Sequence, residues 1–197
     1  MLTGKQFKRA FISGANNILN HRKDVDALNV FPVPDGDTGT NMSMTSSAAV
    51  RELQVVSDDE DLSIVAAKTA AALLRGARGN SGVILSLVFR GISNGFKGKK
   101  EVGGKDLAAA LTLGKESAYK AVMKPTEGTI LTVVRKAAAA AEALASDDCG
   151  AVLDEAYRAA QEALAETPEL LPVLKEAGVV DAGGQGFLYI LDGIRGY

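Results

Sequence analysis

Most of the chain consists of segments in which apolar residues recur three and four positions apart. In the first segment, Phe7, Phe11 and Ile18 fall on one side of a stretch that runs from about residue 3 to residue 21. This spacing predicts an α-helix with one buried face. The pattern recurs along the rest of the chain, and valine pairs such as Val55-Val56 are too short to indicate strands.

Later segments with helical spacing cover residues 42–53, 62–75, 83–90, 107–122, 130–144 and 153–164, with a short helix at 167–175 and a last one from residue 187. Residues 91–104 are rich in glycine and lysine and are predicted to form a loop. Neighbouring helices joined by short loops run antiparallel and close around a shared core. The pattern therefore predicts an all-α fold, an antiparallel bundle of about eight helices.

The polar stretch Asn29–Met42 interrupts this helical pattern. It reads Asn-Val-Phe-Pro-Val-Pro-Asp-Gly-Asp-Thr-Gly-Thr-Asn-Met. Its prolines fix φ and push the residues before them into extended geometry, so residues 30–34 are predicted to form a stiff, non-helical arm. Gly36 adds no side chain between Asp35 and Asp37, and these two carboxylates can face the same point.

Two carboxylates held this close repel each other, and a cation between them relieves the repulsion. Mg²⁺ is commonly bound by one or two carboxylates together with phosphate oxygens. The helix predicted to follow offers free N–H groups at its start, beside Thr38, Thr40 and Asn41, and such a start binds anions. The stretch therefore indicates a site for a nucleoside triphosphate.

Two other interpretations of this stretch compete with a nucleotide site. Pro-Asp-Gly-Asp alone is a common turn composition with solvated carboxylates. An EF-hand fits poorly, because its loop has glycine at the sixth position and glutamate at the twelfth, where this chain has Thr40 and Ser46.

Three more polar, glycine-bearing turns precede apolar helical segments, at residues 75–82, 123–129 and 178–186. Each is also explained by ordinary helix capping. No strand is predicted before the glycines of residues 76–82, so they are not a dinucleotide-binding fingerprint, and no phosphate-binding loop of the Gly-x-x-x-x-Gly-Lys-Ser/Thr type is present.

Composition excludes several classes of protein. A net charge of −2 without a basic stripe argues against a nucleic-acid partner. The single Cys149 excludes an intrachain disulfide and a cysteine-rich zinc site. No stretch approaches the ~18 apolar residues of a membrane span, so we expect a soluble, cytoplasmic protein of one domain. His21 is better explained as a surface residue at a helix end than as part of a site.

The stretch Asn29–Met42 resembles the nucleotide-binding domain shared by the L subunit of dihydroxyacetone kinase and, more closely, the ATP-binding subunit of bacterial fatty acid kinase. This resemblance implies an antiparallel eight-helix barrel with ATP and two Mg²⁺ ions at one end. It also implies that residues 1–197 are a single DhaL-like ATP-binding domain, the N-terminal part of a longer protein.

The resemblance assigns roles to particular residues. Asp35 and Asp37 would hold the metal ions and so take part in catalysis, and Asn29 takes the place of a third metal ligand, with Asp26 and Asp181 as alternatives. The residues expected to contact ATP, or to hold the turns that do, are Thr38, Thr40, Asn41, Gly79, Asn80, Ser81, Gly82, Thr129, Asp181 and Gly183.

The activity implied is transfer of the ATP γ-phosphate to the carboxylate of a fatty acid held by a separate fatty-acid-binding protein, which yields an acyl phosphate. Two alternatives stay open: a dihydroxyacetone-kinase-type phosphotransferase subunit, and a non-catalytic helical interaction module. Dimerisation through segments outside this chain also stays open.

Overall fold

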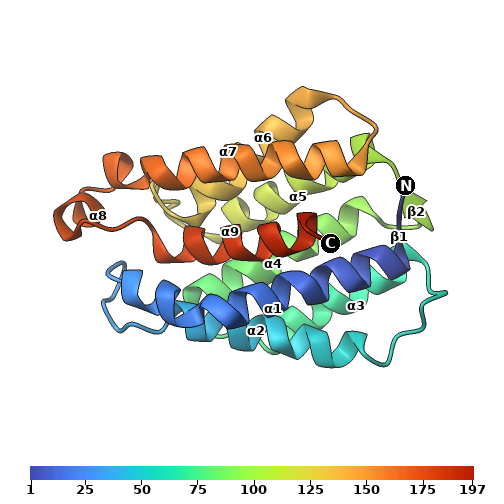
Figure 1. The fold of residues 1–197 in the computed structure, drawn as a ribbon, viewed down its shortest axis with the longest axis horizontal. Coiled ribbons are helices and arrows are strands. Elements are labelled where there is room, and N and C mark those ends of the chain that lie inside the picture. Colours follow the sequence, from blue (N-terminus) through green and yellow to red (C-terminus); the bar gives the residue numbers. More distant parts are fainter.

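The structure is a computed structural model that describes all 197 residues, and it is almost entirely helical (Figure 1). The helices are α1 (Gly4–Leu28), α2 (Thr38–Leu53), α3 (Leu62–Arg75), α4 (Gly79–Gly95), α5 (Gly104–Ala121), α6 (Ile130–Leu144), α7 (Cys149–Leu170), α8 (Pro172–Ala177) and α9 (Ala182–Arg195). Strands β1 (Leu2–Thr3) and β2 (Glu101–Val102) pair antiparallel.

The eight long helices form a closed ring around one apolar core. Each packs against the next along the chain, α7 packs against α9, and α9 returns to pack against α1. Large side chains such as Phe11, Ile18 and Leu85 fill the inside of the ring and are almost fully buried. The predicted all-α barrel of eight helices is therefore confirmed, and the six-residue α8 is a ninth helix outside the ring.

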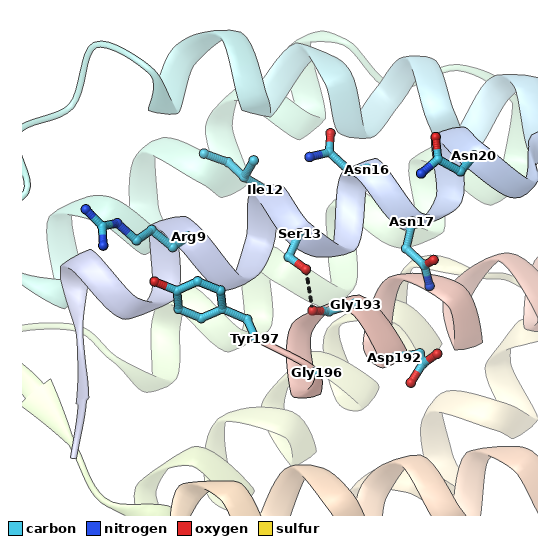
Figure 2. Close-up of a pocket in the computed structure, with 10 residues that line it drawn as sticks. All are labelled: Arg9, Ile12, Ser13, Asn16, Asn17, Asn20, Asp192, Gly193, Gly196 and Tyr197. Atoms are coloured by element: carbon cyan, nitrogen blue, oxygen red, sulfur yellow. Dashed lines mark hydrogen bonds between the residues drawn. The ribbon is translucent and has the colours of Figure 1, made fainter.

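The seam that closes the ring lies between α1 and α9. A Cβ added to Gly193 would lie 2.6 Å from Gly14 Cα, so these glycines let the two backbones touch. Ser13 Oγ donates a hydrogen bond of 2.7 Å to the carbonyl of Gly193 (Figure 2), and Asn17 Nδ2 donates one of 2.7 Å to the carbonyl of Tyr189. Backbone contact and hydrogen bonds together join the two ends of the chain.

Several predicted helices were too short; the second and the last begin at Thr38 and Ala182, earlier than the predicted residues 42 and 187. The first helix continues beyond residue 21 to Leu28, because Val25 is fully buried in the core and extends the apolar face. The segment predicted as a loop at 91–104 is partly helical, since α4 continues to Gly95 before the short strand β2.

The predicted short helix at 167–175 is wrong. Helix α7 continues through Pro168 to Leu170, and α8 begins only at Pro172. Proline has no N–H to give to the carbonyl four residues earlier. Here Thr167 Oγ donates to that carbonyl, on Leu164, at 2.7 Å, which lets the helix tolerate Pro168.

The antiparallel ring brings four helix starts to one end of the barrel. The connections α1–α2, α3–α4, α5–α6 and α7–α9 all lie there, on the left of Figure 1, so the N-termini of α2, α4, α6 and α9 face the same region. None of the helices combines the length and apolar character needed to cross a membrane.

We expect the substitution Gly193→Ala to destabilise the fold. The new methyl group would lie 2.6 to 2.8 Å from backbone atoms of Ser13 and Gly14, which have no flexible end that could move aside. Overpacking of this kind costs about 1–3 kcal/mol of unfolding free energy, measurable by urea denaturation. The control Gly150→Ala, whose nearest neighbour is the exposed Asp148 side chain, should change stability by less than about 0.5 kcal/mol. Equal effects of the two substitutions would contradict a backbone contact at the seam.

Candidate functional site

The arm between α1 and α2 carries the two acids. Residues 29–37 contain no helix, as predicted, and the Phe31-Pro32 peptide bond is cis. Gly36 has a φ of 67°, a left-handed conformation that favours glycine. Asp35 and Asp37 on either side of it both line one hollow, of about 200 Å³. The structure therefore brings the two carboxylates to a common space.

The last turns of α1 hold the first turn of α2 in place. A Cβ on Gly39 would lie 2.1 Å from the carbonyl oxygen of Arg22, so the two helices touch through their backbones. Asp26 accepts two hydrogen bonds from Thr40, from its N–H at 2.9 Å and from its hydroxyl at 2.7 Å. Both carboxylate oxygens of Asp26 are therefore engaged in fixing α2.

Asn29 shapes the arm through both ends of its amide. Its oxygen accepts hydrogen bonds from the N–H groups of Asp37 and Thr38, at 3.1 and 3.2 Å, and its Nδ2 donates to the carbonyl of Val33 at 3.1 Å. Since an amide oxygen has two lone pairs, a metal ion could bind it only by displacing one of these bonds.

The open helix start at this end of the barrel belongs to α4. The expectation of free N–H groups at the start of α2 is met only at Gly39, because Asn29 and Asp26 accept from the N–H groups of Asp37, Thr38 and Thr40. The N-cap of α4, Arg78, makes no capping bond through its side chain, and no side chain accepts from the N–H groups of Gly79, Asn80 or Ser81. Free N–H groups and the helix dipole favour an anion at such a start.

Helix α2 fixes the start of α4 beside the acids. Arg78 donates its backbone N–H to Thr45 Oγ at 3.0 Å. Gly79 has a φ of 68°, and a Cβ there would lie 2.6 Å from the side-chain nitrogen of Asn41. Gly79, Asn80 and Ser81 therefore line the same hollow as Asp35 and Asp37.

A second hollow, of about 440 Å³, continues from the first and is largely apolar. The two share Phe31, Pro32, Asn80 and Ser81 as lining residues, so they form one cleft with a polar and an apolar half. The apolar side chains of the second half come from three places in the chain, namely Phe31 and Pro32 on the arm, Val83, Ile84 and Leu87 on α4, and Ala121, Val122, Ile130 and Leu131 around the α5–α6 connection.

Asp181 joins three helices at the base of the apolar half. It is the N-cap of α9 and accepts from the N–H of Gly184 at 2.9 Å, and the backbone N–H of Ile130 at the start of α6 lies close enough to act on its pKa. Its own N–H donates to Thr167 Oγ of α7 at 3.1 Å. Burial raises the pKa of Asp181 to about 6, against the two N–H donors that act to lower it.

The structure brings most of the predicted site residues together. The polar half is lined by Asn29, Asp35, Asp37, Thr38, Asn41, Gly79, Asn80 and Ser81, and Thr129, Asp181 and Gly183 line the apolar half.

Two predicted site residues do not line the cleft. Thr40 is engaged with Asp26, and Gly82 is buried against Thr45, where a Cβ would meet the hydroxyl at 2.5 Å. His21 lines neither half of the cleft and stacks on Tyr189 with ring centroids 4.2 Å apart.

Sequence reasoning missed the apolar half. Val83, Ile84 and Leu87 belong to an apolar run that indicates only a buried helix, and nothing local separates a cleft-lining residue from a core residue. Phe31 is the residue that could have indicated the apolar half. It lies directly before a proline in a polar turn, where a large apolar side chain needs other apolar groups to pack against.

The acids are a pair and not a larger cluster. No group of three or more His, Cys, Asp or Glu side chains is arranged to hold a metal ion. Mg²⁺ commonly takes one or two carboxylates and completes its octahedron with phosphate oxygens and water. Asp35 and Asp37 therefore fit this ion when a phosphate group lies beside them.

Another groove, larger and more open, lies on α1 and α9 (Figure 2). It is lined by polar side chains such as Asn16, Asn20 and Asp192, and its Ser13 and Asn17 already bond to carbonyls of α9. The groove contains none of the acids of the arm and no free helix start. It therefore lacks the features that make the cleft a candidate site.

Asp181 should make the stability of the fold depend on pH. Its folded-state pKa, about 6, exceeds the ordinary aspartate pKa of 3.8, so the folded state holds this proton more tightly than the unfolded state. The stabilisation of the folded state by protonated Asp181 is therefore greatest below about pH 4 and is lost as the pH rises to about 6. This loss lowers the free energy of unfolding by up to about 3 kcal/mol.

The substitution Asp181→Asn should remove this loss, since asparagine does not titrate and is also a good N-cap. Urea denaturation of both proteins between pH 4 and pH 7 measures the difference. Parallel pH profiles for the two proteins would contradict a raised pKa at Asp181.

Sequence comparison finds close relatives of this chain. Protein YloV of Bacillus subtilis is 50% identical over 194 residues, which are 98% of this chain and 35% of that protein. Proteins of Staphylococcus haemolyticus and Staphylococcus epidermidis, both described as uncharacterised, are 46% identical over the same shares. The chain thus spans about a third of the length of the curated relatives it matches.

Among solved structures, dihydroxyacetone kinase of C. freundii has the same fold. Its native form matches with a TM-score of 0.70 and 20% identity, over 96% of this chain and 34% of that one. Its complex with AMP-PNP and Mg²⁺ matches with a TM-score of 0.72 and 19% identity, over 96% and 33%. The model of the DAK2 domain matches residues 32–196, which include both acids, the start of α4 and Asp181, and the chain therefore belongs to the DAK2 domain family.

Proposed function

We propose that this chain is the Mg²⁺-dependent ATP-binding domain of a kinase. The observation that carries the proposal is the division of one cleft into two chemically different halves. Two carboxylates face an open helix start in one half, and apolar side chains line the other. A nucleoside triphosphate bound to Mg²⁺ has the same division between its phosphates and its base.

In this proposal the phosphates lie at the start of α4. The N–H groups of Gly79, Asn80 and Ser81 donate to phosphate oxygens, and Asp35 and Asp37 hold Mg²⁺ on the opposite side, with two ions as the expected number. The base lies in the apolar half, between Phe31 of the arm and the side chains of α4 and α6. The hollow of about 440 Å³ there lies within the range of ligand pockets.

The comparisons support the nucleotide and the metal. The dihydroxyacetone kinase that shares this fold was solved with AMP-PNP and Mg²⁺, and the DAK2 domain model covers the stretch that carries both acids.

The chemistry proposed for this cleft is transfer of the terminal phosphoryl group. Such transfer depends mainly on positioning of the reactants and on neutralisation of the negative charge on the phosphoryl group during transfer. Mg²⁺ supplies that neutralisation when bound. The residues of the chain hold and orient the reactants. Asn29 and Asp26 keep the acids in place, and α4 aligns the phosphate chain, so no side chain is required as a nucleophile.

The acceptor proposed is the carboxylate of a fatty acid, presented by a separate fatty-acid-binding protein and converted to an acyl phosphate. This choice follows from the resemblance of Asn29–Met42 to the fatty acid kinase subunit. Transfer to dihydroxyacetone on another partner is the second candidate, and the fold shared with dihydroxyacetone kinase favours it.

Removal of either acid should abolish Mg²⁺-dependent ATP binding. We expect Asp35→Ala and Asp37→Ala each to raise the Kd for Mg-ATP by about 100-fold or more, because each removes one of only two carboxylates available to the metal. Calorimetry with ATP in the presence and absence of Mg²⁺ measures the change, and circular dichroism should show unchanged helix content.

The control for these variants is Asp59→Ala, which removes an exposed acid from the α2–α3 connection at the opposite end of the barrel. It should bind Mg-ATP as the unaltered chain does. Wild-type affinity in both the Asp35 and the Asp37 variants would overturn the assignment of the site.

The acceptor is tested by transfer of labelled γ-phosphate from ATP. With the full-length protein, we expect label to appear on a fatty acid bound to its carrier protein, and none on dihydroxyacetone presented with its own binding subunit. The opposite pattern would favour the second candidate and leave the nucleotide site untouched. Both reactions should fail with Asp37→Ala, which links any activity to this cleft.

A further inference from the structure

The segment between α5 and α6, residues 122–129, forms one wall of the apolar half of the cleft. Val122, Lys124, Thr126 and Thr129 line this half. The segment has no regular secondary structure, so its shape depends on side-chain contacts. Whatever fixes these residues also fixes the width of the space in which the base would lie.

Three side chains from three neighbouring parts of the chain close a triangle behind this wall. Tyr119 Oη, on the last turn of α5, donates to Glu127 Oε2 at 2.9 Å. Arg135, on α6, donates through Nε to Tyr119 Oη at 3.3 Å and through its terminal nitrogen to Glu127 Oε1. Each residue therefore contacts the other two, and the triangle ties the segment to both helices.

The far end of the segment is also fixed. Gly128 has a φ of 86° and donates its N–H to Thr132 Oγ at 2.8 Å, and a Cβ there would lie 2.8 Å from Leu171 Cβ. Thr129 Oγ donates to the carbonyl of Thr126 at 2.7 Å. These contacts hold residues 126–129, the second half of the segment, in a fixed position relative to α5 and α6.

None of the three residues of the triangle lines the cleft. Partial burial alone would raise the pKa of Glu127, but the hydrogen bonds from Arg135 and Tyr119 lower it below its ordinary value. The carboxylate therefore stays ionised at neutral pH, and its ion pair with Arg135 persists there. Any effect of these side chains on a bound nucleotide must act through the position of the wall.

We propose that Tyr119, Glu127 and Arg135 are positioning residues that hold the 122–129 wall against the nucleoside and so set the affinity of the cleft for the base and ribose. This inference rests on the proposed ATP site and adds the part of the chain that shapes its base half. The phosphate half, built by the arm and α4, does not depend on the triangle.

The test compares two ligands that differ by the nucleoside. Mg-ATP occupies both halves of the cleft, whereas Mg-tripolyphosphate occupies the polar half alone. The variants Tyr119→Phe, Glu127→Gln and Arg135→Gln each alter one member of the triangle and so weaken the two contacts that this member makes. We expect each to raise the Kd for Mg-ATP by about fivefold, as removal of one member of a partly exposed network does, with the Kd for Mg-tripolyphosphate unchanged.

A matched control is Arg158→Gln. Arg158 also pairs with two glutamates, Glu155 and Glu162, but all three lie on the outer face of α7. This variant should bind both ligands as the unaltered chain does. In the full kinase assay, the triangle variants should raise KM for ATP with kcat unchanged, and Arg135→Lys should restore part of the affinity because it keeps the charge.

The outcomes separate the two proposals. If the unaltered chain binds neither ligand, the proposed function fails. A second outcome is that the unaltered chain binds both ligands while all three variants, including the mild Tyr119→Phe, bind Mg-ATP with wild-type affinity. In that case the positioning role fails and the proposed function stands. Equal weakening of both ligands would also overturn the positioning role, since that pattern reports a general loss of structure.

Discussion

The position of the two acids depends on a backbone contact between α1 and α2. Gly39 lies so close to the carbonyl of Arg22 that no side chain would fit between them. Asp26 and Asn29, on the last turn of α1 and just after it, then satisfy the N–H groups of Asp37, Thr38 and Thr40. The arm that carries Asp35 and Asp37 begins at Asn29 and ends at the first turn of α2. Both of its ends are therefore fixed by the contact between α1 and α2.

The same contact decides where an anion would bind. Four helices begin at this end of the barrel, and in three of them a side chain accepts from at least one N–H group of the first turn: Asn29 and Asp26 in α2, Thr129 in α6, and Asp181 in α9. The start of α4 has none. An unsatisfied N–H group costs free energy unless water or a ligand accepts from it, so the polar half of the cleft is where the chain leaves N–H donors for a ligand.

Much of the fold could be predicted from local features of the chain. The spacing of apolar residues predicted the helices, and the prolines at 32 and 34 predicted the arm, because both depend on near neighbours. The failures have two causes, one a local side-chain bond and the other burial by distant parts of the chain. Pro168 stays within α7 because the Thr167 hydroxyl bonds the carbonyl of Leu164, and α1 extends to Leu28 because the barrel buries Val25.

For the site, the sequence alone determined the candidate residues: a stiff arm with two acids separated by one glycine, and polar turns before four helices. Only the tertiary structure decided how these parts combine. It showed that Thr40 and Gly82 serve packing, that Asn29 bonds to the arm it precedes, and that apolar residues of α4 and α6 complete the cleft. The reason is physical: whether a polar group is free to bind a ligand depends on which groups, distant in the chain, have already bonded to it.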